Sequence, residues 1–125
     1  MTRVVNEARV RAGTERSEAR DLGVFLIRSR SAGKRLVGLA FLQEAPEPGA
    51  LEDVLGLVSG SATAFEMFHA LVAIKEMSPL LTASQKEAAI ETLEREKDDP
   101  RGIGVMDDAN LPTLIDQVLD SLVSG

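Results

Sequence analysis

The stretch NLPTLIDQVLDSL, residues 110–122, indicates the fold class. Its apolar residues recur at i, i+3, i+4, i+7, i+8 and i+11, and they are Leu111, Leu114, Ile115, Val118, Leu119 and Leu122. This spacing is typical of one helix face packed on a core. Asn110 can cap the helix, and Pro112 falls in the first turn, where a missing amide costs nothing. The sequence therefore predicts an amphipathic helix here.

Two capping boxes upstream predict two further helices. In Thr63-Ala64-Phe65-Glu66, the Thr63 hydroxyl is expected to accept from an amide three residues on while Glu66 reaches back. The expected apolar stripe of that helix is Phe65, Phe68, Leu71 and Val72, widened by Met67 and Ile74, and Ser78-Pro79 ends it. In Thr82-Ala83-Ser84-Gln85, the box opens a polar surface helix to about Lys97, with Ala89, Ile90 and Leu93 facing inward.

The first 60 residues carry weaker signals. A short helix is predicted over residues 51–58. The apolar runs 22–27 and 36–42 fit either helices or a β-hairpin. Leu22, Phe25 and Leu26 share a helical stripe, Gly33 can cap its end, and an eight-residue spacer is long for a hairpin loop, which favours helix. Residues 2–20 are expected to form an exposed helix or a partly ordered arm.

The predicted fold is all-α, a compact bundle of five to seven short helices in a single domain over residues 1–125. The alternative is an α+β fold with a hairpin at residues 22–42. A chain of 125 residues has room for one core, and four Phe with no Trp or Tyr make that core aliphatic. An aliphatic core favours helix-on-helix packing over a sheet sandwich.

The composition excludes several classes of chemistry and shows an uneven distribution of charge. The absence of cysteine excludes disulfides and thiolate chemistry, and no run is apolar enough for a signal peptide or membrane span, so a cytoplasmic protein is expected. The net charge of −6 conceals an asymmetry. Residues 1–35 hold nine Arg or Lys against four Asp or Glu, a balance of +5, whereas the rest hold five against sixteen, or −11.

No catalytic pattern emerges, so a non-enzyme without a cofactor is predicted. The single histidine, in Glu66-x-x-His69, matches half of a carboxylate-bridged di-iron motif, which would be completed only across an oligomer, so Glu66 and His69 are weak metal candidates. A half-buried structural role for His69 is the expected alternative. Gly33-Lys34-Arg35 fails the phosphate-loop pattern because Arg28 and Arg35 replace its glycine and hydroxyl positions.

The remaining candidates are interaction surfaces. They are a basic segment (Arg28, Arg30, Lys34 and Arg35), an acidic helix (Glu87, Glu91, Glu94 and Glu96) and an apolar strip in the 98–109 connection (Ile103, Val105 and Met106). They predict an interaction, adaptor or assembly module whose partner is another protein or a second copy of the chain. Nucleic-acid binding through the basic N-terminal third is a weaker alternative, because the whole chain is acidic and poor in aromatic residues.

Overall fold

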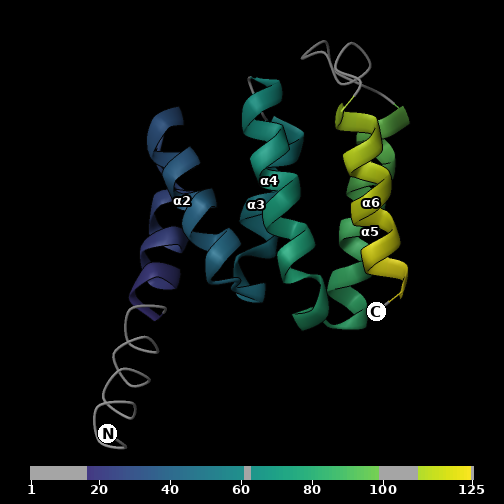
Figure 1. Ribbon diagram of the computed structural model, residues 1–125, viewed down its shortest axis with the longest axis horizontal. Helices are drawn as coiled ribbons and strands as arrows, with labels where there is room; N and C mark the ends of the chain where they lie inside the picture. Colours follow the sequence, from purple (N-terminus) through teal and green to yellow (C-terminus); the bar gives the residue numbers. More distant parts are fainter. Residues whose placement is uncertain (1–16, 61–62, 99–109, 125) are drawn as a thin grey trace, which may run out of the picture.

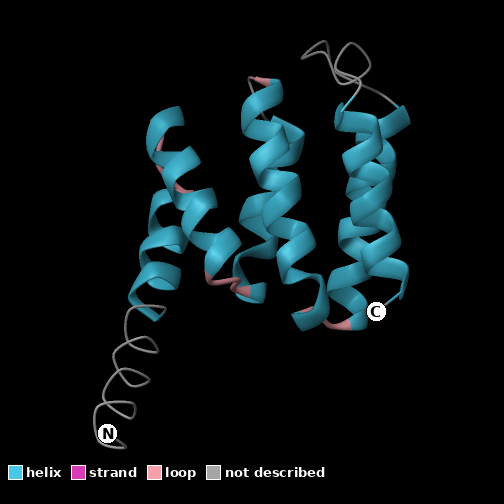
Figure 2. Cartoon of the chain, in the orientation of Figure 1, coloured by secondary structure: helices cyan, strands magenta, loops and turns pink. Residues whose placement is uncertain are grey.

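The computed structural model describes residues 17–60, 63–98 and 110–124. Its α-helices are a first helix with described residues 17–26, α2 (Ala32–Glu44), α3 (Leu51–Gly60), α4 (Ala64–Met77), α5 (Ala83–Asp98) and α6 (Asn110–Ser124). Two 3-10 turns, η1 (Pro48–Ala50) and η2 (Ser78–Leu80), precede α3 and follow α4. This part of the chain contains no strand (Figure 2), which confirms the all-α bundle and makes the hairpin at 22–42 wrong.

The helices form a stack of three antiparallel pairs (Figure 1). The first helix pairs with α2, α3 with α4, and α5 with α6. One layer holds α2, α4 and α6, which begin at the same end of the molecule, and the other holds the first helix, α3 and α5. Because α4 packs against α2, α3 and α6, it is the central helix of the stack.

The core runs through the whole stack and is aliphatic, as the composition predicts. Met67, Leu71, Ile74 and Met77 of α4 are fully buried, and α6 contributes its predicted stripe to the same cluster. Each large side chain removed from water in this way contributes about 1.5–3 kcal/mol to folding. Core burial on α4 and α6 therefore joins the second and third pairs.

The first pair is packed differently, through glycine. A Cβ on Gly38 would lie 2.8 Å from the backbone nitrogen of Ile27 and 2.9 Å from the carbonyl oxygen of Gly23, so these two backbones are nearly in contact. Leu22, Phe25 and Leu26 lie on a helix, as the sequence predicts, but their stripe does not face the core, because Leu22 is 45% and Phe25 74% exposed. Gly33 lies in the first turn of α2 and does not cap the helix before it.

The two predicted capping boxes differ in outcome. At Thr82 both arms form, since the Gln85 amide donates to the Thr82 hydroxyl at 3.2 Å and the Thr82 amide donates to Gln85 Oε1 at 2.9 Å. At Thr63 the hydroxyl accepts from the Glu66 amide at 3.1 Å, but the Glu66 carboxylate points toward α2. The buried arc of α4 lies around Met67 and Leu71, so the prediction that Phe65 and Phe68 belong to the core is wrong.

Candidate interaction surfaces

The basic segment is divided between structural and exposed side chains. Arg35 Nε donates to Glu66 Oε1 at 2.8 Å, its Nη2 lies 3.4 Å from Oε2, and its Nη1 donates to the Ser29 carbonyl at 3.0 Å. The Glu66 side chain is 3% exposed, so this pair joins α2 to α4 largely out of water. Arg28 donates to Asp53 on α3 at 2.9 Å, although its own side chain is 64% exposed. Arg35 is thus part of the fold, and Arg28 is held at its surface.

The pairing also shifts the pKa of Arg35. The hydrogen bond to Glu66 raises the pKa of the guanidinium above its ordinary value, desolvation acts in the opposite direction, and the negative charge of Glu66 raises it further. Because arginine is already cationic at ordinary pH, the pairing reinforces a charge that Arg35 carries in any case.

Arg30 and Lys34 remain as the exposed cations of the segment. Arg30 lies in the turn between the first helix and α2, and Lys34 lies in the first turn of α2. The structure gives neither side chain an ion pair within residues 17–60, 63–98 and 110–124. An open hollow of about 450 Å³ is lined by Phe25, Leu26, Arg28, Ser29 and Lys34. The turn thus places positive charge next to an exposed aromatic ring.

Glu66 and His69 do not share a ligand site. Both carboxylate oxygens of Glu66 lie within hydrogen-bond range of Arg35, while Nδ1 of His69 lies 3.1 Å from Nε2 of Gln43. No group of three His, Asp or Glu side chains that could hold a metal ion occurs in the described ranges. His69 is half-buried, as expected for a structural histidine, and Gln43 Nε2 also donates to its carbonyl at 3.1 Å.

The exposed face of α4 is aromatic, which the sequence reasoning missed. Phe65 is 61% and Phe68 38% exposed, and the His69 ring meets both edge-on, at centroid distances of 4.6 and 5.4 Å. Half-buried Val72 continues this face toward Lys75 and Glu76. The sequence does contain a second set of apolar residues at helical spacing, residues 67, 70, 71 and 74, which by itself defines a complete core face.

The acidic helix, α5, lies at the opposite end of the stack from the basic segment (Figure 1). Glu87, Glu91 and Glu94 of α5 are exposed as predicted, and Arg95 pairs with Glu91 at 3.1 Å, whereas Glu96 is buried and so is not on that face. A direct contact between α5 and the basic segment would therefore require two copies of the chain. Ile103, Val105 and Met106 lie outside the described residues.

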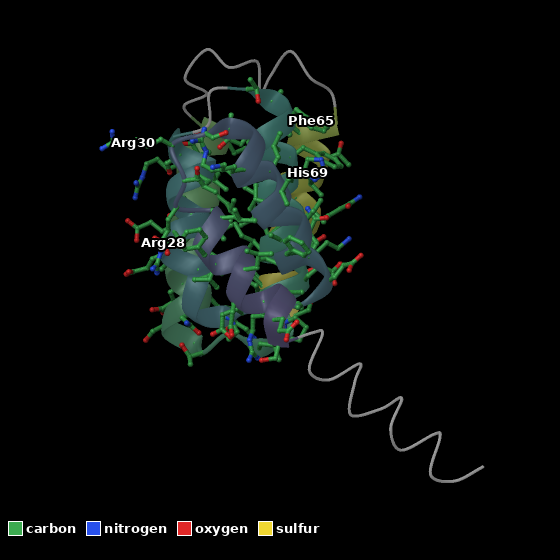
Figure 3. The ribbon with its side chains drawn as sticks, turned by 90° about the vertical axis from the view of Figure 1, so that its left-hand side faces the viewer. Arg28, Arg30, Phe65 and His69 are labelled. Atoms are coloured by element: carbon green, nitrogen blue, oxygen red, sulfur yellow. The ribbon has the colours of Figure 1, made fainter. Side chains whose placement is uncertain are left out.

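The surfaces point in different directions. Figure 3 looks onto the first helical pair, with Arg28 and Arg30 projecting on one side and Phe65 and His69 lying on the other.

None of the described helices has the length and apolar character of a membrane span. The chain matches no protein-family model, no curated protein and no solved structure.

Proposed function

We propose that the chain is a non-catalytic interaction module that binds another protein through the exposed face of α4. The observation that carries the proposal is that two aromatic rings, Phe65 and Phe68, are exposed on α4, the central helix of the stack. Buried aromatic anchors account for much of the binding energy in protein interfaces, and two large rings left in water are costly unless something covers them.

The rings are also held in place before any partner arrives. His69 contacts both of them edge-on, and Gln43 of α2 holds the His69 imidazole and backbone. Side chains that are already ordered lose less conformational entropy on binding. Lys75 and Glu76, both exposed, supply charged groups at the end of the same face. The expected partner surface is therefore apolar, with charges at its edge.

Crosslinking in the cells that make the protein tests the proposal. A photoreactive phenylalanine analogue replaces Phe68 in one variant and Leu80 in another, because Leu80 is an exposed apolar residue (54%) of η2, which follows the C-terminal end of α4 and so lies well beyond Phe68 along the chain. We expect a discrete crosslinked protein from position 68 and none from position 80. Equal crosslinking at both positions would contradict the proposal.

Binding of the captured protein then supplies the quantitative test. The Phe65→Ser/Phe68→Ser double variant should bind it at least about tenfold more weakly, as expected when aromatic anchors are removed, and Leu80→Ser should bind it like the parent chain. Circular dichroism checks that both variants fold. Unchanged affinity in the double variant would place the interface elsewhere. A cytoplasmic location and an adaptor or assembly role stay predictions.

A further inference from the structure

The outward side of α2 carries a stripe of four residues with symmetric spacing and opposite charges at its two ends. At 100° per residue, Lys34, Val37, Phe41 and Glu44 share one side, opposite Leu39 and the side chains that reach α4. Val37 is 49% exposed, Phe41 is half-buried, and Lys34 and Glu44 are exposed. The steps of three, four and three residues place a cation at one end, an acid at the other and apolar groups between.

The first helix extends the same pattern. Gly23 and Ile27 face α2, while Arg20 pairs at 3.6 Å with Glu47, just before η1, and half-buried Val24 packs against the core. The opposite side therefore presents Glu18, Leu22 and Leu26, with Leu22 45% exposed. Again the acid lies far from the turn, and the turn itself carries Arg30. The whole outer face of this pair is apolar in the middle and oppositely charged at its two ends.

We propose that two copies of the chain form a symmetric dimer through this face, with α2 antiparallel to α2 of the second copy. A two-fold axis across the middle of α2 places Lys34 opposite the partner's Glu44, and Val37 opposite the partner's Phe41. Each contact occurs twice, as two-fold symmetry requires. On the first helix the same axis brings Arg30 toward the partner's Glu18.

The same face of a second copy is a better partner for this surface than the α5 end of a second copy would be. Lys34 and Glu44 lie about 15 Å apart along one helix, at 1.5 Å per residue, which is too far for them to pair within one chain. The structure gives neither side chain an ion pair in the part of the chain that it describes. The outer side of α5 presents Glu87, Glu91 and Glu94, so stacking it here would bury carboxylates against Leu22 and Val37.

Sedimentation equilibrium of the full chain over a concentration series tests the dimer. One helical pair offers less than the roughly 800 Å² per partner of a standard interface, so we expect dissociation at about 1–100 μM. Val37→Asp should abolish the dimer because it buries a charge at its centre. Val123→Asp is the matched control, since Val123 is 75% exposed at the far end of the stack, and it should leave the dimer intact. Thermal unfolding checks that both variants fold.

Charge reversal tests the orientation. Lys34→Glu and Glu44→Lys should each weaken the dimer at least about fivefold, since each replaces two attractive contacts by two repulsive ones. The double variant Lys34→Glu/Glu44→Lys should recover to within about twofold, because every pair is then opposite in charge again. A chain that is monomeric at every concentration would overturn the dimer. A dimer that survives Val37→Asp, or a double variant no tighter than the single ones, would overturn the packing. Because this face does not include Phe65 or Phe68, either outcome is independent of the proposed function.

Discussion

The two helical pairs at the ends of the stack are held together by different means. In the α5–α6 pair, large aliphatic side chains fill the interface, and Leu93, Leu111 and Ile115 are all fully buried. In the pair formed by residues 17–26 and α2, backbones meet at Gly23 and Gly38, and Leu22 and Phe25 remain in water. The outer face is acidic at the α5 end and apolar at the other.

The difference separates two ways of attaching a helix. Aliphatic packing stabilises by removing apolar area from water, and it leaves a polar outer face that ends the stack. Glycine packing allows close van der Waals contact between backbones but buries little side chain. We therefore expect the first pair to be the less stable end, kept in place by its ion pairs and by Ile27, Leu39 and Leu42 of the core.

The largest expected effect contrasts one leucine from each end. Leu93→Ala should lower the free energy of unfolding by about 3–4 kcal/mol, because it removes a fully buried side chain and leaves a cavity. Leu22→Ala should lower it by less than about 1 kcal/mol, because the side chain is already 45% exposed. Urea unfolding measures both. Comparable losses would show that the first pair is packed like the last and would remove the contrast.

The second largest loss of stability is expected from removing the ion pairs of the first helical pair. Arg35→Met leaves the buried Glu66 carboxylate without its partner and should cost about 2–3 kcal/mol, somewhat less than a fully buried pair because the Arg35 side chain is 19% exposed. Asp53→Asn removes the exposed pair with Arg28 and should cost less than about 1 kcal/mol.

Chemical denaturation of both variants and of Arg35→Met/Glu66→Leu checks this explanation. The double variant should recover most of the loss, because no unpaired charge is then buried. A double variant as unstable as Arg35→Met would show that the arginine acts through its packing and its bond to the Ser29 carbonyl.

Gly38→Ala tests the glycine contact directly. The new Cβ would lie within 3.0 Å of two backbone atoms, neither of which can move aside as a flexible side chain can. We expect a loss of about 1–3 kcal/mol, as for overpacking of a core. Amide hydrogen exchange should become faster in residues 17–26 and stay unchanged in α6, since the strain is local. Faster exchange in α6 as well would mean that the two ends unfold as one unit.

The same contrast explains how much of the fold the sequence predicted. The helices over 64–77, 83–98 and 110–124 were predicted because their large apolar side chains repeat at helical spacing and their caps are recognisable. The first pair was ambiguous because glycine carries no hydrophobic signal, and its visible apolar residues, Leu22 and Phe25, face outward. A pattern of apolar residues does not distinguish a face that meets the core from one that remains exposed.

The candidate surfaces were predicted less well, for a related reason. Charge clusters are visible in sequence, so Arg30, Lys34, Glu87, Glu91 and Glu94 were correctly placed on the surface. Their long-range pairing was not visible, and Arg35 joins Glu66 across 31 positions. The rings of Phe65 and Phe68 were assigned to the core because they share a helical spacing with Leu71 and Val72. The sequence contains a second apolar set on α4, at residues 67, 70, 71 and 74, and the three-dimensional arrangement showed that this set alone faces the core.

The smallest expected effect is a gain in the free energy of unfolding, and it provides the control for Gly38→Ala. Gly56 lies inside α3, is exposed, and a Cβ there would meet nothing within 4 Å. Gly56→Ala should therefore raise the free energy of unfolding by about 0.5–1 kcal/mol, because alanine loses less backbone entropy in a helix. Thermal and urea unfolding beside Gly38→Ala measure the difference. Since both substitutions add the same methyl group to a helix interior, opposite signs isolate the backbone contact at Gly38, and equal signs would mean that the close approach to Gly23 and Ile27 relaxes at little cost.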